Sequence, residues 1–275
     1  MRASMPHPLG LITLLTDFGD RDWFVASMKG VILTINPHAT IVDLSHCVPP
    51  HLIEDAAYLL KSCYRYFPDG TVHVAVVDPG VGTRRRPLVV KTARHYFLGP
   101  DNGLFSYIFS EEPEVEVREI ENQQYRIKSI GHTFDGRDLF APAAAWLTTN
   151  QPLESFGRRI EERVAFPIVN PKREAKGFVG EVVYVDHFGN LITNLTLKHV
   201  DAIRSTAPSE GPALQIAGHR VYGLVANYAE GSKVKPSALI NSNGAIEVFI
   251  KEGNAAQQLK MGRGVEITLI FDPEN

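Results

Sequence analysis

The first part of the chain alternates between short apolar runs and amphipathic segments. Residues 11–16 form an apolar run, and from Phe24 to Ile35 apolar side chains recur at helical spacing. A second apolar run covers 40–45, a second helical pattern covers 52–64, and valines then alternate over 72–76. This strand–helix–strand–helix–strand order predicts a parallel sheet that binds ligands near the carboxyl ends of its strands.

Shorter runs continue this α/β pattern. Residues 88–92 and 96–98 predict strands, the turn at 100–103 precedes a short helix, and 138–147 predicts an Ala-rich helix. Charged residues and prolines then follow, and 166–177 is interpreted as a linker. We therefore expect an N-terminal α/β domain over residues 1–165.

Beyond the linker the pattern changes to short β-type runs separated by Gly, Asn and Pro. The runs are 178–185, 213–216, 220–225, 238–240, 245–250 and 265–271. Many short strands with turn residues between them are typical of a small barrel or sandwich. The predicted fold is thus an α/β sandwich with a mostly parallel sheet, followed by a smaller β-barrel-like domain over 178–275.

Composition excludes several classes of function. The net charge is −3 at pH 7, and Arg84, Arg85 and Arg86 form the only tight basic cluster, so we expect neither nucleic acid nor a membrane as a partner. No apolar run reaches membrane-spanning length, and because residues 1–10 lack a sustained apolar stretch we expect no signal peptide. The two cysteines favour a cytoplasmic protein without disulfides, and the ten histidines lack ligand spacing, so no metal site is expected.

Acidic residues stand at the ends of two predicted strands. Asp17 follows the first apolar run, and Asp78 begins a Pro/Gly loop that ends in arginines. Such acids can face one crevice, and a carboxylate can accept two hydrogen bonds from a ribose diol. The structural alternative for Asp17 is the N-cap of the following helix, and for Asp78 an ordinary strand-to-turn boundary.

Three further polar segments allow both a structural and a functional interpretation. Residues 133–138 can form a capped turn in which Asp138 starts a helix. Residues 186–190 can form a turn, or Phe188 can stack on a planar base while Asn190 reads its edge. Residues 241–244 are typical of a hairpin turn. No dinucleotide-binding, P-loop, zinc-protease or nucleophile-elbow motif occurs.

Six ordered motifs together carry a resemblance that spans nearly the whole chain. They are TDFG at 16–19, DPGVGTRRR at 78–86, PDNG at 100–103, TFDGRDLFAPAAA at 133–145, DHFGNLITN at 186–194 and GNAA at 253–256. The set resembles the S-adenosyl-L-methionine (SAM) hydroxide adenosyltransferases, which are adenosine-forming SAM hydrolases. This family is related to enzymes that fluorinate or chlorinate the same substrate.

The resemblance implies hydrolysis of SAM to adenosine and L-methionine, through in-line attack of water on the ribose C5′. It implies no cofactor, with SAM as substrate and adenosine as product. It also implies a homotrimer whose active sites lie between one subunit's N-terminal domain and a neighbour's C-terminal domain. The alternatives are halide transfer to the same carbon and a non-catalytic protein that binds SAM or adenosine.

The resemblance also implies roles for individual residues. Asp78, Arg85 and Asp135 occupy the positions of a catalytic Asp–Arg–His triad, and Asp135 departs from the family's usual histidine. His132 is a poor substitute for that histidine. It lies three residues before Asp135, and on an extended segment a side chain at that spacing points to the opposite face. The implied substrate-binding residues are Asp17, Phe18, His51, Pro79, Val81, Thr133, Phe134, Gly136, Asp186, Phe188, Asn190, Tyr228, Ser242, Asn243, Asn254 and Ala255.

Within that set the family assigns parts of the substrate. Asp17 would bind the ribose diol. Asp186 and Ser242 would hold the amino and carboxylate groups of methionine. The residues around adenine would be Phe188, Asn190, Asn254 and Ala255, with Tyr228 stacking. Halogenating relatives lack the acid at the position of Asp78, and a carboxylate there repels halide in a pocket of low dielectric constant, so the sequence favours water as the nucleophile.

Overall fold

The structure is a computed structural model that describes residues 7–204 and 211–272. The chain divides into two compact units between Ile168 and Val169. Strand β7 (Lys172–Glu174) lies within the segment 166–177 that the sequence pattern assigns to a linker, and it pairs with the first long strand of the second unit. Ordered structure of the second unit therefore begins inside that segment.

The N-terminal unit is built on a six-stranded sheet in the order β2-β1-β3-β5-β4-β6. The strands are β1 (Leu11–Thr16), β2 (Thr40–Ser45), β3 (Val72–Val76), β4 (Pro87–Lys91), β5 (Tyr96–Pro100) and β6 (Glu116–Glu119). Strands β2, β1, β3 and β5 run parallel, whereas β4 and β6 pair antiparallel. The predicted α/β fold with a mostly parallel sheet is confirmed.

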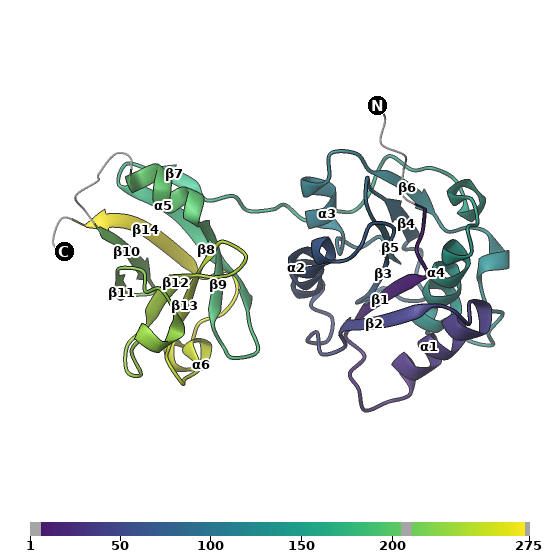
Figure 1. The fold of residues 1–275 in the computed structure, drawn as a ribbon, viewed down its shortest axis with the longest axis horizontal. Coiled ribbons are helices and arrows are strands. Elements are labelled where there is room, and N and C mark those ends of the chain that lie inside the picture. The colour runs from purple at the N-terminus through teal and green to yellow at the C-terminus, as the bar shows by residue number, and fades with distance from the viewer. Residues whose placement is uncertain (1–6, 205–210, 273–275) are drawn as a thin grey trace. The chain divides into compact units, whose positions relative to one another are not determined.

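Helices cover both faces of this sheet (Figure 1). Helices α1 (Phe24–Ile35) and α4 (Ala141–Thr148) pack on one face, and α2 (Ile53–Cys63) and α3 (Ser106–Glu111) pack on the other. Strand β3 is buried along its whole length because it lies between these layers. Each fully buried valine there contributes about 1.5–3 kcal/mol, so the position at which β3 ends is strongly fixed.

A five-residue π-helical turn, Gly136–Phe140, precedes α4 without a break. The predicted helix over 138–147 is therefore present, but it begins two residues earlier and in a wider turn. The remaining short helical turns are η1 (Tyr64–Tyr66), η2 (Gln123–Tyr125) and η4 (Leu153–Phe156). π turns occur often at functional sites, because the extra residue redirects the side chains around it.

The C-terminal unit is an antiparallel sheet in the order β11-β10-β14-β8-β9-β13-β12, to which β7 adds beside β8. The strands are β8 (Gly177–Val185), β9 (Leu191–Thr196), β10 (Gly211–Ile216), β11 (His219–Tyr222), β12 (Ser237–Ile240), β13 (Ala245–Phe249) and β14 (Glu266–Asp272). The edge strands β11 and β12 contact each other, which nearly closes the sheet. The predicted β-barrel-like architecture is confirmed.

Short helices of this unit have no counterpart among the predicted runs. They are α5 (Leu197–Arg204), α6 (Ala255–Leu259) and the turn η5 (Tyr228–Glu230). Helices of this length depend on tertiary packing rather than on intrinsic propensity, so periodicity gives little warning of them. In the ranges 7–204 and 211–272, no helix combines the length and apolar character needed to cross a membrane.

Candidate active site

Two neighbouring parallel strands deliver acidic residues to one edge of the N-terminal sheet. Strands β1 and β3 pair with Thr16 opposite Val76, and Asp17 and Asp78 follow these strand ends. The carboxylate Oδ2 of Asp17 accepts a hydrogen bond from the backbone N–H of His51 at 3.0 Å. The N-cap alternative for Asp17 is wrong, because α1 begins after Trp23.

The loop that follows Asp78 turns back, so that Arg85 contacts Asp78. The backbone N–H of Val81 donates to the carbonyl of Asp78 at 3.2 Å, and the Thr83 hydroxyl donates to the Gly80 carbonyl at 2.7 Å. Gly82 has φ +79°, and a Cβ there would lie 3.1 Å from the His132 carbonyl oxygen. Glycine is therefore required both for the turn and for the close approach of the neighbouring segment.

Asp78 and Arg85 form a buried ion pair that uses only one carboxylate oxygen. The Nε and Nη2 atoms of Arg85 lie 2.8 and 2.6 Å from Asp78 Oδ2, and the two side chains are 4% and 11% exposed. The other oxygen, Oδ1, is buried and accepts no hydrogen bond from any residue that the structure describes. An acceptor in that state is costly to bury, so it has capacity for a donor such as water.

Asp135 extends this pair into a chain of four charges. Its Oδ2 accepts a hydrogen bond from Nη2 of Arg85, and its Oδ1 accepts one from Nη2 of Arg126. Burial opposes the charged form of Arg85, but hydrogen bonds and charge from Asp78 and then Asp135 outweigh burial, so the pKa of this guanidinium is raised. The charges alternate as Asp78, Arg85, Asp135 and Arg126, which leaves the chain neutral.

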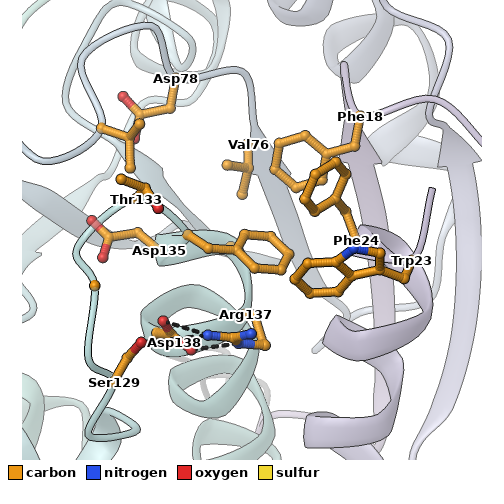
Figure 2. Close-up of a pocket in the computed structure, with 14 residues that line it drawn as sticks. Phe18, Trp23, Phe24, Val76, Asp78, Ser129, Thr133, Asp135, Arg137 and Asp138 are labelled. Atoms are coloured by element: carbon orange, nitrogen blue, oxygen red, sulfur yellow. Dashed lines mark hydrogen bonds and ion pairs between the residues drawn. The ribbon is translucent and has the colours of Figure 1, made fainter.

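A cavity of about 490 Å³ lies beside these acids (Figure 2). The predicted site residues that line it are Phe18, Asp78, Val81, Thr133, Phe134, Asp135 and Gly136. Asp17, His51 and Pro79 do not line this cavity, and Arg85 instead borders a second one of about 210 Å³ together with Arg126 and His132. His132 is thus placed on the Arg85 side of the network, outside the cavity that Asp78 lines.

An aromatic wall stands across the cavity from Asp78 and Asp135 (Figure 2). The ring of Phe134 makes edge contacts with Phe18, Trp23 and Phe24 at centroid distances of 5.7, 5.6 and 5.3 Å. At Gly136 a Cβ would lie 3.1 Å from both Phe18 and Phe134, so glycine lets these rings approach. Such a wall gives the cavity an apolar side opposite its acids.

Several residues of this site escape detection from the sequence. Phe24 enters the predicted helix pattern only as an apolar position, and Trp23 lies just before that pattern, although both line the cavity. Arg137 also lines it, with its guanidinium 5.1 Å from the Phe134 ring and paired with Asp138. Arg126 follows a short irregular turn and no local motif connects it with Asp135. Only the aromatic pair Trp23-Phe24, which begins four residues after the TDFG motif ends, could have signalled the wall.

In the C-terminal unit, the loop 186–190 folds around its own acid. Oδ1 of Asp186 accepts hydrogen bonds from the backbone N–H groups of Phe188 and Asn190 at 2.9 and 2.8 Å, and its Oδ2 accepts one from the Asn190 amide at 3.0 Å. The turn interpretation of this segment is therefore confirmed. The loop leaves the Phe188 ring 71% exposed while Asn190 is buried.

The loop packs against the start of α6. The backbone N–H of Ala256 donates to the Gly189 carbonyl at 2.9 Å, and a Cβ on Gly189 would lie 2.1 Å from the Asn254 side chain. Asn254 caps α6, because its Oδ1 accepts the N–H of Gln257 at 2.8 Å. The structure thus brings Phe188, Asn190, Asn254 and Ala255 together.

Glu247 connects the other candidates of this unit, and sequence reasoning missed it. Glu247 is 3% exposed. Its carboxylate accepts hydrogen bonds from the Tyr228 hydroxyl at 2.7 Å and from the Asn241 amide at 3.2 Å. Burial raises the pKa of this carboxyl, although these hydrogen bonds act against the shift. Tyr228 is 49% exposed. An acid inside the apolar run 245–250 is the signal that could have drawn attention to Glu247.

The hairpin turn between β12 and β13 holds Ser242 and Asn243. The N–H of Gly244 donates to the Asn241 carbonyl at 2.9 Å, and Gly244 has φ +78°. The predicted hairpin is confirmed, and both Ser242 and Asn243 are exposed in it. Across residues 7–204 and 211–272, no group of three or more His, Cys, Asp or Glu side chains has the geometry of a metal site.

Both units match one family of proteins. Residues 12–157 match the SAM hydroxide adenosyltransferase N-terminal domain, and residues 180–268 match its C-terminal domain. An (R)-S-adenosyl-L-methionine hydrolase of Thermus thermophilus is 35% identical over 94% of this chain and 99% of its own length. A fluorinase of Actinopolyspora mzabensis is 26% identical over 98% of this chain and 99% of its own.

A solved structure agrees with these matches. The crystal structure of an uncharacterized conserved protein from Thermotoga maritima has a TM-score of 0.86 and 33% sequence identity, and it covers 94% of this chain and 99% of its own. The similarity therefore extends over both units, and the motifs and the two domain matches occur in the same order. The chain belongs to the SAM hydroxide adenosyltransferase family.

Proposed function

We propose that this protein hydrolyses SAM to adenosine and L-methionine, and that Asp78 handles the attacking water. The reaction is taken from the names of two relatives, which are (R)-S-adenosyl-L-methionine hydrolases. The (R) in these names denotes a configuration of the substrate, and we propose the same configuration for the substrate of this chain. The observation that carries the role of Asp78 is its buried oxygen Oδ1, which has no hydrogen-bond donor among the residues that the structure describes, while Asp78 lines the cavity.

This reaction needs no general acid, but it needs precise positioning of the attacking water. The oxygen of water attacks the ribose C5′, the C5′–S bond breaks, and its electron pair stays on sulfur. Methionine therefore leaves as a neutral thioether and needs no protonation, and the reaction needs no cofactor. Alignment of water opposite sulfur can contribute about 7–11 kcal/mol to lowering the barrier.

The ion pair assigns a role to each oxygen of Asp78. Arg85 occupies Oδ2, so Oδ1 is the atom that accepts the hydrogen bond and then the proton of the attacking water. Asp135 accepts a hydrogen bond from Nη2 of Arg85, the atom that also contacts Asp78, and acts through this guanidinium. In this proposal Asp78 is the base, whereas Arg85 and Asp135 orient it.

The remaining predicted residues bind the substrate in this proposal. Asp17, next to His51, binds the ribose diol, and Phe18, Val81, Thr133, Phe134 and Gly136 shape the cavity beside C5′. Phe188, Asn190, Asn254 and Ala255 surround adenine with Tyr228, while Asp186, Ser242 and Asn243 bind the methionine end. The proposal includes the homotrimer that the family resemblance implies, in which one subunit covers another's cavity.

Two free cysteines, Cys47 and Cys63, support the proposal of a cytoplasmic location. Burial raises the pKa of the Cys63 thiol to about 11, so this group stays protonated and unreactive at neutral pH. Only Cys47 is exposed. Neither thiol has a place in the proposed reaction.

Turnover in oxygen-18 water tests the proposal. SAM of both sulfonium configurations is incubated with the protein, and we expect the label in the 5′-hydroxyl of adenosine. Asp78→Asn is expected to abolish most of this product. Adenosine without label, or undiminished turnover by Asp78→Asn, would contradict the assignment of water to Asp78.

Halide transfer is the second candidate, because fluorinases are also among the relatives, although at lower identity than the hydrolases. The open oxygen of Asp78 argues against it, since a carboxylate repels an anion in a poorly solvated cavity. The same assay with chloride or fluoride separates the two reactions. A halogenated nucleoside would favour the second candidate, and binding measured by calorimetry without any product would favour a non-catalytic protein.

A further inference from the structure

The two acids of the charge network differ in how many cations hold them. Both oxygens of Asp135 accept hydrogen bonds from guanidinium groups, one from Arg85 and one from Arg126. Among residues 7–204 and 211–272, Arg85 holds one oxygen of Asp78 and no side chain or backbone group holds the other. Arg126 and Arg85 therefore share the compensation of the charge on Asp135.

The position of Arg126 is set by the backbone around it. Its N–H donates to the carbonyl of Gln123 at 3.3 Å, which closes the turn η2. The next N–H, of Ile127, donates to the Asp138 carbonyl at 2.8 Å, within the π turn that begins one residue after Asp135. Backbone pairing thus holds Arg126 beside Asp135, although the two residues belong to different turns.

Competition for Arg85 follows from the shared atom. Nη2 of Arg85 lies 2.6 Å from Asp78 Oδ2 and also bonds Asp135, so the two acids draw on one guanidinium group. The Asp135 side chain is 7% exposed, and water can do little to compensate its charge. Without Arg126 the whole compensation of Asp135 would come from Arg85, at the expense of Asp78.

We infer that Arg126 is a positioning residue for the proposed hydrolysis: by compensating Asp135, it keeps Arg85 on Asp78 Oδ2 and leaves Oδ1 as the acceptor for water. The inference rests on the proposed function and adds a fourth member to its catalytic network. Arg126 itself does not line the cavity beside Asp78. Its effect therefore reaches the reaction through Asp135 and Arg85.

A double-mutant cycle tests the inference, with Arg126→Gln, Asp135→Asn and the combination of both. Arg126→Gln is expected to lower kcat by about 10- to 100-fold while KM for SAM changes by less than about threefold. With Asn at position 135 no charge remains to be compensated. There, removal of Arg126 is expected to change kcat by less than about threefold.

Two further variants separate positioning from general damage. Arg126→Lys retains the cation and is expected to recover most of the lost kcat. Arg84→Gln removes an exposed arginine of the neighbouring loop, and we expect wild-type kinetics from it. If Arg126→Gln fails to fold, the comparison of Asp135→Asn with the double variant carries the test alone.

The outcomes distinguish this inference from the proposed function. Absence of adenosine from the wild-type protein would overturn the proposed function and the inference with it. Normal wild-type turnover with an unchanged kcat in Arg126→Gln would overturn only the inference. An equal loss of kcat on removing Arg126 with Asp or Asn at position 135 would also overturn it, because the effect would not pass through the charge of Asp135.

Discussion

The candidate residues of the two units are held in opposite ways. In the N-terminal unit, Asp78, Arg85, Asp135 and Arg126 bind one another, and they are joined across as many as 50 residues of sequence. In the C-terminal unit, Asp186 and Asn254 use their side chains to close their own loop and helix end. The first arrangement fixes charge inside the protein, and the second fixes the shape of a surface.

This difference teaches where chemistry and recognition reside. A buried network of charges has one arrangement, which suits the alignment of a reacting water. A rigid loop that presents an exposed ring, such as Phe188, suits stacking on a flat base. We therefore expect substitutions in the N-terminal set to change kcat and substitutions in the C-terminal set to change KM.

The largest effect is expected from Asp78→Asn. An amide cannot accept the proton of water, so kcat is expected to fall by about 10²- to 10³-fold with a small change in KM. Steady-state kinetics with SAM measures both. Asp69→Asn changes an exposed acid that precedes the other end of β3 and is the matched control. A rise in KM with unchanged kcat would place Asp78 among the binding residues and break the comparison.

Acid is expected to weaken the N-terminal unit through two buried histidines. Burial, followed by the charge of His95, lowers the pKa of His73 to about 3, and burial followed by Arg94 lowers that of His95 to about 4. Both values lie below the ordinary 6.5, so the unfolded chain binds more protons. Stability is complete above about pH 6.5 and falls as pH drops toward these values, by roughly 2 kcal/mol per histidine at pH 5.

Denaturant titrations between pH 7 and pH 5 measure this loss. His95→Gln is expected to reduce the slope of unfolding free energy against pH, because one titrating group is gone. His219→Gln, on the exposed strand β11 of the other unit, is the control. An equal slope in wild type and His95→Gln would show that the buried ring does not govern the acid sensitivity.

Phe188→Ala sharpens the comparison from the side of recognition. Loss of stacking on adenine is expected to raise KM by about 5- to 150-fold, since stacking on an aromatic side chain contributes about 1–3 kcal/mol per base. The exposed ring adds little to the core, so the melting temperature should stay within about 1 °C. Tyr222→Ala removes another exposed ring of the same unit and should leave KM unchanged. A fall in kcat alone would contradict the recognition role.

The smallest effect is expected from Glu247→Gln. The amide still accepts one hydrogen bond, but it holds the Tyr228 hydroxyl and the Asn241 amide less firmly, and KM is expected to rise by about 3- to 10-fold. Tyr228→Phe removes the same bond from the other side and should give a similar KM. Unequal KM values for the two variants, measured with SAM, would separate the roles of the two residues.

The effect of Glu247 on stability against pH is opposite to that of the two histidines. Its pKa is raised by burial, so the stability it contributes is lost as pH rises.

The sequence predicts the fold best where burial is two-sided. The bounds of β1 and β3 follow directly from their apolar runs, because a strand between two helix layers has few polar positions. The pairing of Asp78 with Arg85 was also accessible, since one short loop contains both. The pairing of Arg126 with Asp135 cannot be predicted from the sequence, because the two residues lie in separate turns that only the folded backbone brings together. Glu247 escapes detection because it lies inside an apolar strand.

The π turn before α4 has a consequence for how this site can change. Each residue added to or removed from a helix rotates everything on its amino side by about 100° relative to the rest. Asp135 immediately precedes Gly136–Phe140, whereas α4 is anchored in the core beyond it. A single-residue deletion here is expected to turn the Asp135 carboxylate away from both arginines, so the length of this turn matters to the site as much as its chemistry.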